Sequence, residues 1–423
     1  MIAPSSESLR AQLELPLAKR RIPFAVVSVF VLLPLSVVWS LFAFLRSLLR
    51  GKRKDSLPDV VRVVSVGNVS VGGTGKSPVV RSVARMAFNG GYDVAIITRG
   101  YAPSGPAARV IARIHDSLFA ESEGKVTLLS DETLEHAIQL QSYVNESNSL
   151  WICQGKNRQW LFETLVEQWR ACVSSHQSGP PRKLAVILDD GLQQTALPVH
   201  RDVIVWSPET VQQAPQMCLP YGPYRMGFPV RFFWNWAIPA GDVVVWSRLR
   251  SRDEQSAFHE LATTAAQKLG IQTARGAPTA LSCIENRELA QICESHGFGF
   301  KLLRDVAGSK LPERVHLLCG IARPERFMAS VERFIRDRGL SVEIESCLAV
   351  SDHGAISQEG LKLLASGATL ITTLKDVSRW WQVVEVKKAI QSGCLFVMCL
   401  EVDLMNAEFK ELNVSFDELF QFQ

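Results

Sequence analysis

The sequence predicts an α/β fold with a parallel β-sheet, flanking helices, a second smaller α/β domain and an N-terminal hydrophobic membrane helix. Short apolar runs that are typical of buried strands alternate with helical patterns, as in VVSVGNV (63–69), YDVAIIT (92–98) and KLAVILDD (183–190). Parallel strands need such crossover helices between them. Further strand-like runs follow residue 266, and an uncharged stretch covers residues 22–45.

These patterns divide the chain into three expected regions. Residues 1–55 form a membrane-associated helix with basic flanks, and SLPDV (56–60) has the composition of a linker. Residues 56–265 form the larger domain and residues 266–423 the smaller one. A chain of 423 residues is long enough for two or three domains that each bury a core.

The composition excludes several classes of protein. With 47% hydrophobic and 21% charged residues, the chain is globular rather than disordered. Its net charge is only +4, so we expect no nucleic-acid binding. The nine cysteines are scattered, and Cys319, Cys394 and Cys399 lie in apolar runs. They are expected to be reduced core residues, which favours a reducing compartment over secretion.

The segment from Ile22 to Leu45 contains no charged residue. As a helix it would be about 36 Å long, which exceeds the hydrocarbon core of about 30 Å. Basic residues flank it, and the larger group follows it: Arg46, Arg50, Lys52, Arg53 and Lys54. This predicts attachment to a membrane surface, either by a spanning helix or by one that lies in the interface. The interfacial alternative is favoured by serines on one helical face, namely Ser28, Ser36, Ser40 and Ser47. A buried core helix is the third alternative.

A glycine-rich loop, SVGGTGKS (70–77), follows the first strand-like run. Successive glycines let backbone N–H groups point at phosphate oxygens, and the lysine of such a loop reaches the β- and γ-phosphates. The Ser77 hydroxyl would ligate Mg²⁺. The residues expected to bind the nucleotide are Gly72, Gly73, Thr74, Gly75, Lys76 and Ser77. Ser70 replaces the usual first glycine, which matches a compact form of the loop, so the pattern predicts a P-loop NTPase-type sheet.

A phosphate loop also needs a carboxylate to complete its magnesium site. Asp189 and Asp190 supply one at the end of a neighbouring apolar run, LAVIL (184–188). We expect Asp189 to be the metal ligand and Asp190 to lie on the substrate side; the alternative is an ordinary polar strand end. No guanine-reading NKxD sequence is present, so the expected nucleotide is ATP.

An ordered series of short pieces resembles the tetraacyldisaccharide 4′-kinase (LpxK) family of lipid A biosynthesis. The pieces are GNVSVGGTGKSP (67–78), TRGY (98–101), SDE (130–132), DDGLQ (189–193), LPYGPYR (219–225), GIARPERF (320–327), DHG (352–354) and TTLKD (372–376). Each piece is weak alone, but their order is specific. The resemblance covers about residues 22–400.

The resemblance implies transfer of the γ-phosphate of ATP to the 4′-hydroxyl of an acylated glucosamine disaccharide 1-phosphate, which gives lipid IVA. It implies that Asp131 is the base, that His353 is its partner and that Lys76 also takes part in catalysis. From the pattern alone, Asp131 would be a helix N-cap and His353 a loop histidine. A carboxylate held by an imidazole suits a weakly nucleophilic sugar hydroxyl.

The resemblance also implies contacts with the substrate. Tyr101, Arg158 and Arg225 fall where the family contacts the disaccharide head, and Gln193 falls near the γ-phosphate. Arginine donors suit the 1-phosphate of the lipid. The alternative for each arginine is a surface ion pair. The expected location is a membrane surface with the catalytic domain on the ATP-containing side. This would be the cytoplasmic face of a bacterial inner membrane or, in a eukaryote, the mitochondrion.

Three positions depart from the usual family pattern. Gln194 stands where histidine is usual, and Met226 and Leu374 stand where glutamate is usual. Two rival functions remain. A membrane-associated P-loop ATPase that acts through protein partners would need a lysine just before the glycine pair, where this chain has Val71. A non-catalytic lipid-binding relative would not need the complete loop that this chain has.

Overall fold

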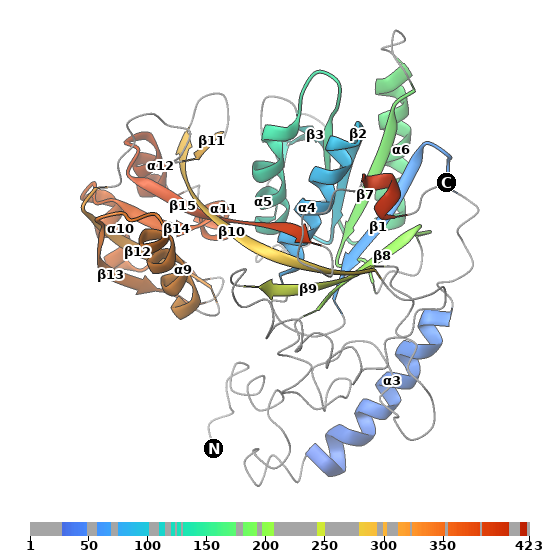
Figure 1. Cartoon of the computed structure of the whole chain (residues 1–423), viewed down its shortest axis with the longest axis horizontal. Coiled ribbons are helices and arrows are strands. Elements are labelled where there is room, and N and C mark those ends of the chain that lie inside the picture. Colours follow the sequence, from blue (N-terminus) through green and yellow to red (C-terminus); the bar gives the residue numbers. More distant parts are fainter. Residues whose placement is uncertain are drawn as a thin grey trace. The chain divides into compact units, whose positions relative to one another are not determined.

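The structure is a computed structural model of the chain (Figure 1). It describes residues 28–48, 57–68, 75–100, 110–114, 120–122, 125–127, 130–174, 181–192, 197–206, 243–249, 279–293, 299–302, 312–321, 324–351, 354–380, 383–405 and 415–420. The chain forms two compact units, each built from separated segments. Unit 1 comprises residues 1–90, 183–285 and 402–423, and unit 2 comprises residues 91–182 and 286–401. The domain boundaries expected near residues 56 and 266 fall outside the described residues, so they stay predictions.

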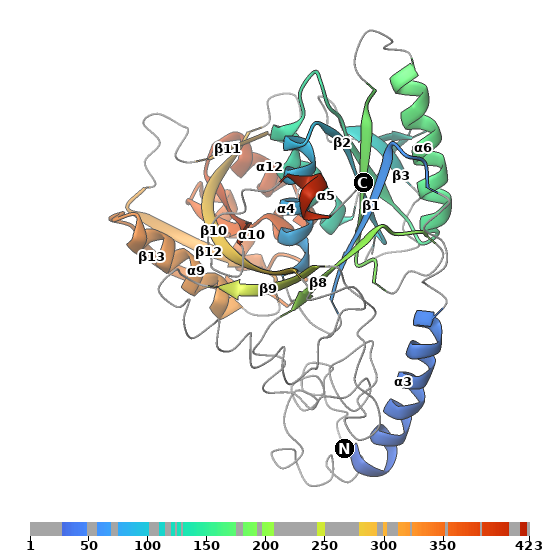
Figure 2. The ribbon, with the colours of Figure 1, turned by 45° about the vertical axis from the view of Figure 1, so that its right-hand side comes forward.

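Unit 1 contains a parallel sheet. Its strands are β1 (Val61–Gly67), β7 (Lys183–Asp189), β8 (Arg201–Trp206), β9 (Val243–Leu249) and the first half of β10 (Thr279–Cys293). β1 pairs in parallel with β7 and β8. β9 pairs in parallel with β8 and β10, and Figure 2 shows these three strands side by side. β1 and β7 are apolar at nearly every position because both of their faces are buried.

Helix α4 (Lys76–Asn89) packs on β1 and β7. Its buried apolar residues include Val80, Val83, Ala84 and Ala87, which recur at the spacing of one helical face. The C-terminal helix α13 (Phe416–Leu419) packs on α4, and its first turn is closed by a capping box between Ser415 and Glu418. The Arg85 guanidinium donates to the carbonyl of Val402 at 2.6 Å, which ties α4 to the last segment of the unit.

The N-terminal part of unit 1 is a π-helix (Ser28–Leu32) that continues as α3 (Leu33–Leu48). Ser36 and Ser40 are fully buried, and the Ser40 hydroxyl donates to the Ser36 carbonyl at 2.7 Å. The exposed side chains are large and apolar: Phe30, Val31, Leu35, Val37, Val38, Trp39, Leu41 and Phe42. We call these eight residues the apolar face of α3. In the part of the chain that the structure describes, no helix combines the length and the apolarity needed to cross a membrane.

Unit 2 contains two groups of strands. In the first, β2 (Tyr92–Thr98) pairs in parallel with β6 (Leu150–Gln154), and β3 (Val110–Ile114) pairs antiparallel to β6. A small hairpin of β4 (Ala120–Ser122) and β5 (Lys125–Thr127) also belongs to this segment. The helices are α5 (Asp131–Leu140), a 3-10 turn (Gln141–Tyr143) and α6 (Arg158–Ser174). The buried Asp93 carboxylate joins β2 to α6, since it accepts from the Trp169 indole N–H at 2.8 Å.

The second group is parallel, in the order β13–β12–β14–β15. Its strands are β12 (Arg314–Cys319), β13 (Glu343–Ala349), β14 (Leu370–Thr373) and β15 (Leu395–Met405). The connecting helices are α9 (Pro324–Asp337), α10 (Gln358–Ala365), α11 (Leu374–Trp380) and α12 (Val384–Gln391). The short β11 (Gly299–Leu302) pairs antiparallel with the end of β10. The predicted α/β class and parallel sheet are therefore confirmed.

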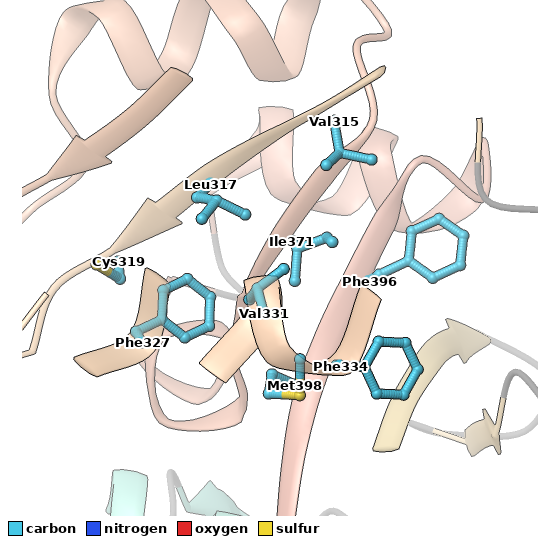
Figure 3. Close-up of a cluster of buried hydrophobic side chains, with 9 residues drawn as sticks. All are labelled: Val315, Leu317, Cys319, Phe327, Val331, Phe334, Ile371, Phe396 and Met398. Carbon is cyan, nitrogen blue, oxygen red and sulfur yellow. The ribbon is translucent and has the colours of Figure 1, made fainter. Parts of the chain in front are cut away.

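Side chains of α9 pack against side chains of the second group of strands and form a buried hydrophobic core with them (Figure 3). Phe327, Val331 and Phe334 lie at the i, i+4, i+7 spacing of one helical face. They pack against Val315, Leu317, Cys319, Ile371, Phe396 and Met398. Burial raises the pKa of the Cys319 thiol to about 12, so this cysteine is neutral in the core. Cys319 and Cys399 are buried as expected, whereas Cys394 is only partly buried.

Candidate functional site: a phosphate-binding loop and a supported helix start

The predicted phosphate-binding segment follows β1 and precedes α4 in the sequence. β1 ends at Gly67, and α4 begins at Lys76. The N-cap residue Gly75 has φ 78°, a left-handed conformation that glycine adopts without strain. The strand–loop–helix order of a P-loop is therefore present. Gly72, Gly73 and Thr74 lie outside the described residues.

Lys76 is held by two oxygen atoms at the strand ends of unit 1. Its Nζ donates to Asn68 Oδ1 at 3.0 Å and to Asp190 Oδ1 at 3.0 Å. Asn68 is almost completely buried, so its amide oxygen is fixed by packing. The ammonium group therefore lies between the end of β1 and the turn after β7, where a phosphate would compete with the Asp190 carboxylate.

Asp189 and Asp190 occupy a tight turn at the end of β7. Asp189 pairs in register with Val66 of β1 and is 6% exposed. Asp190 has φ 53°, which is uncommon for a residue other than glycine and marks local strain. At Gly191 a Cβ atom would lie 2.6 Å from Ser65 Oγ, and the Gly191 N–H donates to the Val66 carbonyl at 3.2 Å. The close approach of β7 to β1 thus requires the glycine, and the turn brings Asp190 into contact with Lys76 at the start of α4.

The donor atoms expected to hold Mg²⁺ suit that ion. Asp189 offers carboxylate oxygens at the end of β7, and Ser77 offers a hydroxyl in the first turn of α4. Mg²⁺ binds hard oxygen ligands and commonly takes only one or two from the protein, with phosphate and water as the others. The residues present therefore fit the ion, although Asp189 and Ser77 stay predicted ligands.

The first turn of α5 in unit 2 carries the predicted base. Ser130 is the N-cap, and its hydroxyl accepts from the Thr133 N–H. Asp131 is the first helical residue, so the N-cap alternative for Asp131 is wrong. The Ser130 N–H donates to Gln154 Oε1 at 2.8 Å, and the Thr133 hydroxyl lies 2.8 Å from that of Thr98. The structure describes Asp131 by its backbone alone, and its role stays a prediction.

Arg158 begins α6 just beyond the end of β6. Its side chain is 3% exposed, so it differs from an ordinary surface arginine. The start of the helix is capped by the Asn157 side chain, which accepts from the Trp160 N–H at 3.1 Å. A buried guanidinium needs hydrogen-bonding partners, so its burial favours a structural or anion-binding role. Its contact with substrate stays a prediction.

Three C-terminal sequence pieces meet around α11. The Asp376 carboxylate of TTLKD accepts from the Gly320 N–H of GIARPERF at 3.0 Å and from the Thr373 hydroxyl at 2.7 Å. The Trp380 indole N–H donates to the Gly354 carbonyl of DHG at 3.0 Å. At Gly320 a Cβ atom would lie 3.1 Å from both Asp376 Oδ1 and the Trp380 ring. Helix α11 therefore holds the ends of the other two pieces.

Helix α11 also packs against α5 within unit 2 (Figure 1). The Ser130–Asp131 helix start and the Gly354 segment are thus connected through one short helix. His353 itself lies outside the described residues. Leu374, one of the departures from the family pattern, is the buried first residue of α11, so an apolar side chain fits there.

The other predicted site residues cannot be placed. Tyr101, Gln193 and Arg225 lie outside the described residues, as do the departures Gln194 and Met226. Conversely, the sequence did not predict the contacts that Asn68, Gln154, Asp376 and Trp380 make around the candidate site. Asn68 and Gln154 each stand at or just after the end of an apolar strand run, which is the one signal that could have found them.

The comparisons with known proteins agree with one another. The family model described as "Tetraacyldisaccharide-1-P 4'-kinase" (LpxK) matches residues 28–418. The tetraacyldisaccharide 4'-kinase of Desulfotalea psychrophila is 28% identical over 355 residues, which cover 81% of this chain and 86% of that protein. The protein of the same name from Syntrophus aciditrophicus is 29% identical over 374 residues, 85% of this chain and 85% of that protein.

A solved structure adds evidence on the fold. The crystal structure of LpxK from Aquifex aeolicus, described as an "apo" form in complex with ATP, has a TM-score of 0.53 and 18% sequence identity to this chain. The match covers 92% of this chain and 96% of that one. The family model spans nearly the whole chain and the full-length relatives carry the same name, so the chain belongs to the tetraacyldisaccharide-1-P 4′-kinase family.

Proposed function

We propose that this chain transfers the γ-phosphate of ATP to the 4′-hydroxyl of a tetraacyldisaccharide 1-phosphate in lipid A biosynthesis. The observation that carries the proposal is the position of Lys76, which lies between Asn68 and Asp190 at the start of α4. This is the place where a P-loop lysine meets the β- and γ-phosphates. Family membership supplies the acceptor lipid.

In this proposal, ATP binding displaces Lys76 from Asp190. The phosphates offer more negative charge than one carboxylate, so Nζ exchanges its contact and neutralises charge on the transferring group. The N-terminus of α4 adds the positive end of its dipole and free N–H groups. Gly72, Gly73 and Thr74 are the further phosphate-binding residues, and Gln193 is the residue near the γ-phosphate.

Mg²⁺ held by Asp189 and Ser77 would supply charge neutralisation at the phosphates. Asp189 suits this role because it is nearly buried at the end of β7, where its carboxylate orientation is set by the strand. Once Lys76 has left it, Asp190 can contact the acceptor. Tyr101, Arg158 and Arg225 are the proposed contacts of the phosphorylated sugar head.

Asp131 is the proposed base for the 4′-hydroxyl, and His353 its partner. The support for Asp131 is its place at the first position of α5, where the backbone is held by a buried hydrogen-bonded network. The support for His353 is indirect. Its neighbour Gly354 is bound by Trp380 of α11, and α11 packs on α5.

The substrate is a lipid, and we propose that the apolar face of α3 attaches the protein to the membrane. Its buried serines and exposed apolar residues give the helix one protein-facing and one apolar side. Such a helix suits the interface between headgroups and acyl chains. We propose that the catalytic part lies on the ATP-containing side, at a bacterial inner membrane or, in a eukaryote, in the mitochondrion.

The proposal is tested by incubating the full chain with ATP labelled at the γ-phosphate and the disaccharide 1-phosphate lipid in mixed micelles. We expect Mg²⁺-dependent transfer of label to the lipid. A lipid that already carries a 4′-phosphate is the matched control and should accept no label. Release of labelled inorganic phosphate that does not depend on the lipid would instead favour the ATPase alternative.

A further inference from the structure

The start of α5 is attached to two strand ends by buried polar side chains. Thr98 is the last residue of β2, Gln154 is the last residue of β6, and the two are paired in register. From these positions they reach the N-terminal turn of α5, Thr98 through the Thr133 hydroxyl and Gln154 through the Ser130 N–H. All four side chains are buried. These hydrogen bonds are therefore sheltered from water, which does not readily compete for their donors and acceptors.

Gln154 also contacts a second predicted substrate segment. Gly100, in TRGY, has φ 62°, and a Cβ atom there would lie 3.0 Å from Gln154 Cβ and 3.2 Å from Gln154 Cδ. The Gly155 N–H donates to the Thr98 carbonyl at 3.2 Å, which holds the chain beyond β6 against the end of β2. Gln154 thus lies between the backbone that precedes Tyr101 and the backbone that precedes Asp131.

We propose that Gln154 is a positioning residue for phosphoryl transfer, which sets the first turn of α5 against the TRGY segment. The inference rests on the proposed role of Asp131. Adjacent Cα atoms are about 3.8 Å apart, so a hydrogen bond to the Ser130 N–H restrains the backbone of Asp131 almost directly. Without the Gln154 oxygen, the buried Ser130 N–H has no acceptor. The start of α5 would then move toward another acceptor, because an unsatisfied buried N–H is costly.

Such a movement matters because a base acts only within hydrogen-bond reach of its proton. Misplacement by about 1 Å can reduce a rate by about 10²-fold. Gln154 would not touch ATP, so its loss should lower kcat and leave the KM for ATP nearly unchanged. If Gln154 had a purely structural role, its loss would instead lower thermal stability, and the effect would not depend on Asp131.

The main variant is Gln154→Met, which keeps the length of the side chain and removes the acceptor. We expect kcat to fall about tenfold or more, with the KM for ATP within about twofold of the original value. Gln154→Glu keeps an acceptor oxygen and should retain most of the turnover. The matched control is Gln139→Met in α5, because both polar atoms of the Gln139 side chain are buried and make no hydrogen bond. That control should leave kcat unchanged.

The decisive measurement combines Gln154→Met with Asp131→Asn. If Gln154 acts through Asp131, the double variant should be little slower than Asp131→Asn alone. Fully multiplicative losses, or an unchanged kcat in folded Gln154→Met, would overturn the inference. If Gln154→Met does not fold, Thr98→Val removes the other attachment and carries the same expectations. Wild-type turnover in Asp131→Asn would instead show that the proposed base is wrong, which is a separate failure.

Discussion

The Lys76 ammonium nitrogen lies 3.0 Å from a carboxylate oxygen of Asp190, and both side chains are partly buried. The pair joins the first turn of α4 to the strained turn after β7. The pair restrains the lysine at the start of α4, since a lysine side chain otherwise samples many rotamers. If Lys76 binds the phosphates as we propose, nucleotide binding competes with this pair, because Asp190 must then release Lys76.

Lys76→Ala should therefore abolish measurable transfer, with a loss of at least about 10²-fold in kcat, as for other groups that stabilise transferring charge. The matched control is Lys183→Ala in the same unit. Lys183 is half-exposed, and its 3.6 Å pair with Asp417 lies at the surface, so its loss should matter little. The measurement is label transfer from ATP to lipid, and near-normal activity of Lys76→Ala would exclude the phosphate-loop assignment.

The strand before the predicted phosphate loop and the helix after it could be predicted because their signals are local. Apolar runs, glycines and a lysine stand within a short stretch of sequence, and the DDG turn follows its own strand directly. The supports of α5 could not be predicted in this way. Gln154 reaches Ser130 because β2 and β6 are neighbours in the sheet. No periodicity in LWICQ (150–154) distinguishes this glutamine from an ordinary polar residue at the end of a strand.

The C-terminal pieces show the same limit. GIARPERF, DHG and TTLKD are short and far apart in sequence, and their resemblance to a family suggested that each has a role. It did not suggest that Asp376 accepts from Gly320 or that Trp380 binds Gly354. These contacts depend on the order β12–β14 in the sheet, which is a tertiary property.

The proposed base pair is tested by Asp131→Asn and His353→Ala. The asparagine keeps the shape of the side chain but is not basic, so turnover should fall by about 10²–10⁴-fold while the affinity for ATP changes little. His353→Ala should fall in the same range. If the two residues act as one unit, the double variant loses much less than the product of the single losses. Independent, multiplicative losses would mean that the two residues do not form a dyad.

Trp380→Phe tests whether α11 supports the DHG segment. The change keeps an aromatic ring against Gly320 and removes the donor to the Gly354 carbonyl, a bond that contributes about 0.5–1.5 kcal/mol. We expect a lower kcat, an unchanged KM for ATP and a small loss of thermal stability. Trp160→Phe, at an exposed position of α6, is the control and should change none of these. An unchanged kcat for Trp380→Phe would separate α11 from catalysis.

The stability of unit 2 should depend on pH through Asp376. Burial raises the pKa of the Asp376 carboxyl, although hydrogen bonds from Gly320 and Thr373 act in the opposite direction. The folded chain then holds this proton more tightly than the unfolded chain, whose carboxyl has the ordinary pKa of 3.8. Stability from this group is therefore greatest at low pH and is lost as pH rises from 3.8 through the folded pKa.

Asp376→Asn removes that titration. Thermal melts of the variant and the original chain should differ least below the ordinary aspartate pKa, and the variant should gain relative stability as pH rises above it. Glu418→Gln is a useful control, because this exposed carboxyl has its pKa lowered by the Ser415 cap and shifts stability in the opposite direction. A difference between Asp376→Asn and the original chain that stays constant with pH would contradict the raised pKa.

Membrane attachment is tested on the apolar face of α3. Val38 is 66% exposed in the middle of that face, and Val384, at the start of α12, is 59% exposed in unit 2. If α3 lies in the membrane interface, Val38→Asp loses the burial of one apolar side chain and places a charge there. The cost of at least about 1.5 kcal/mol should lower partitioning onto anionic phospholipid vesicles by about tenfold or more. Val384→Asp makes the same chemical change away from α3 and should not alter partitioning.

Activity on a detergent-solubilised acceptor should be equal in the two variants, because the substitution affects access to the membrane and not phosphoryl transfer. Equal vesicle binding by both variants would place the attachment outside α3.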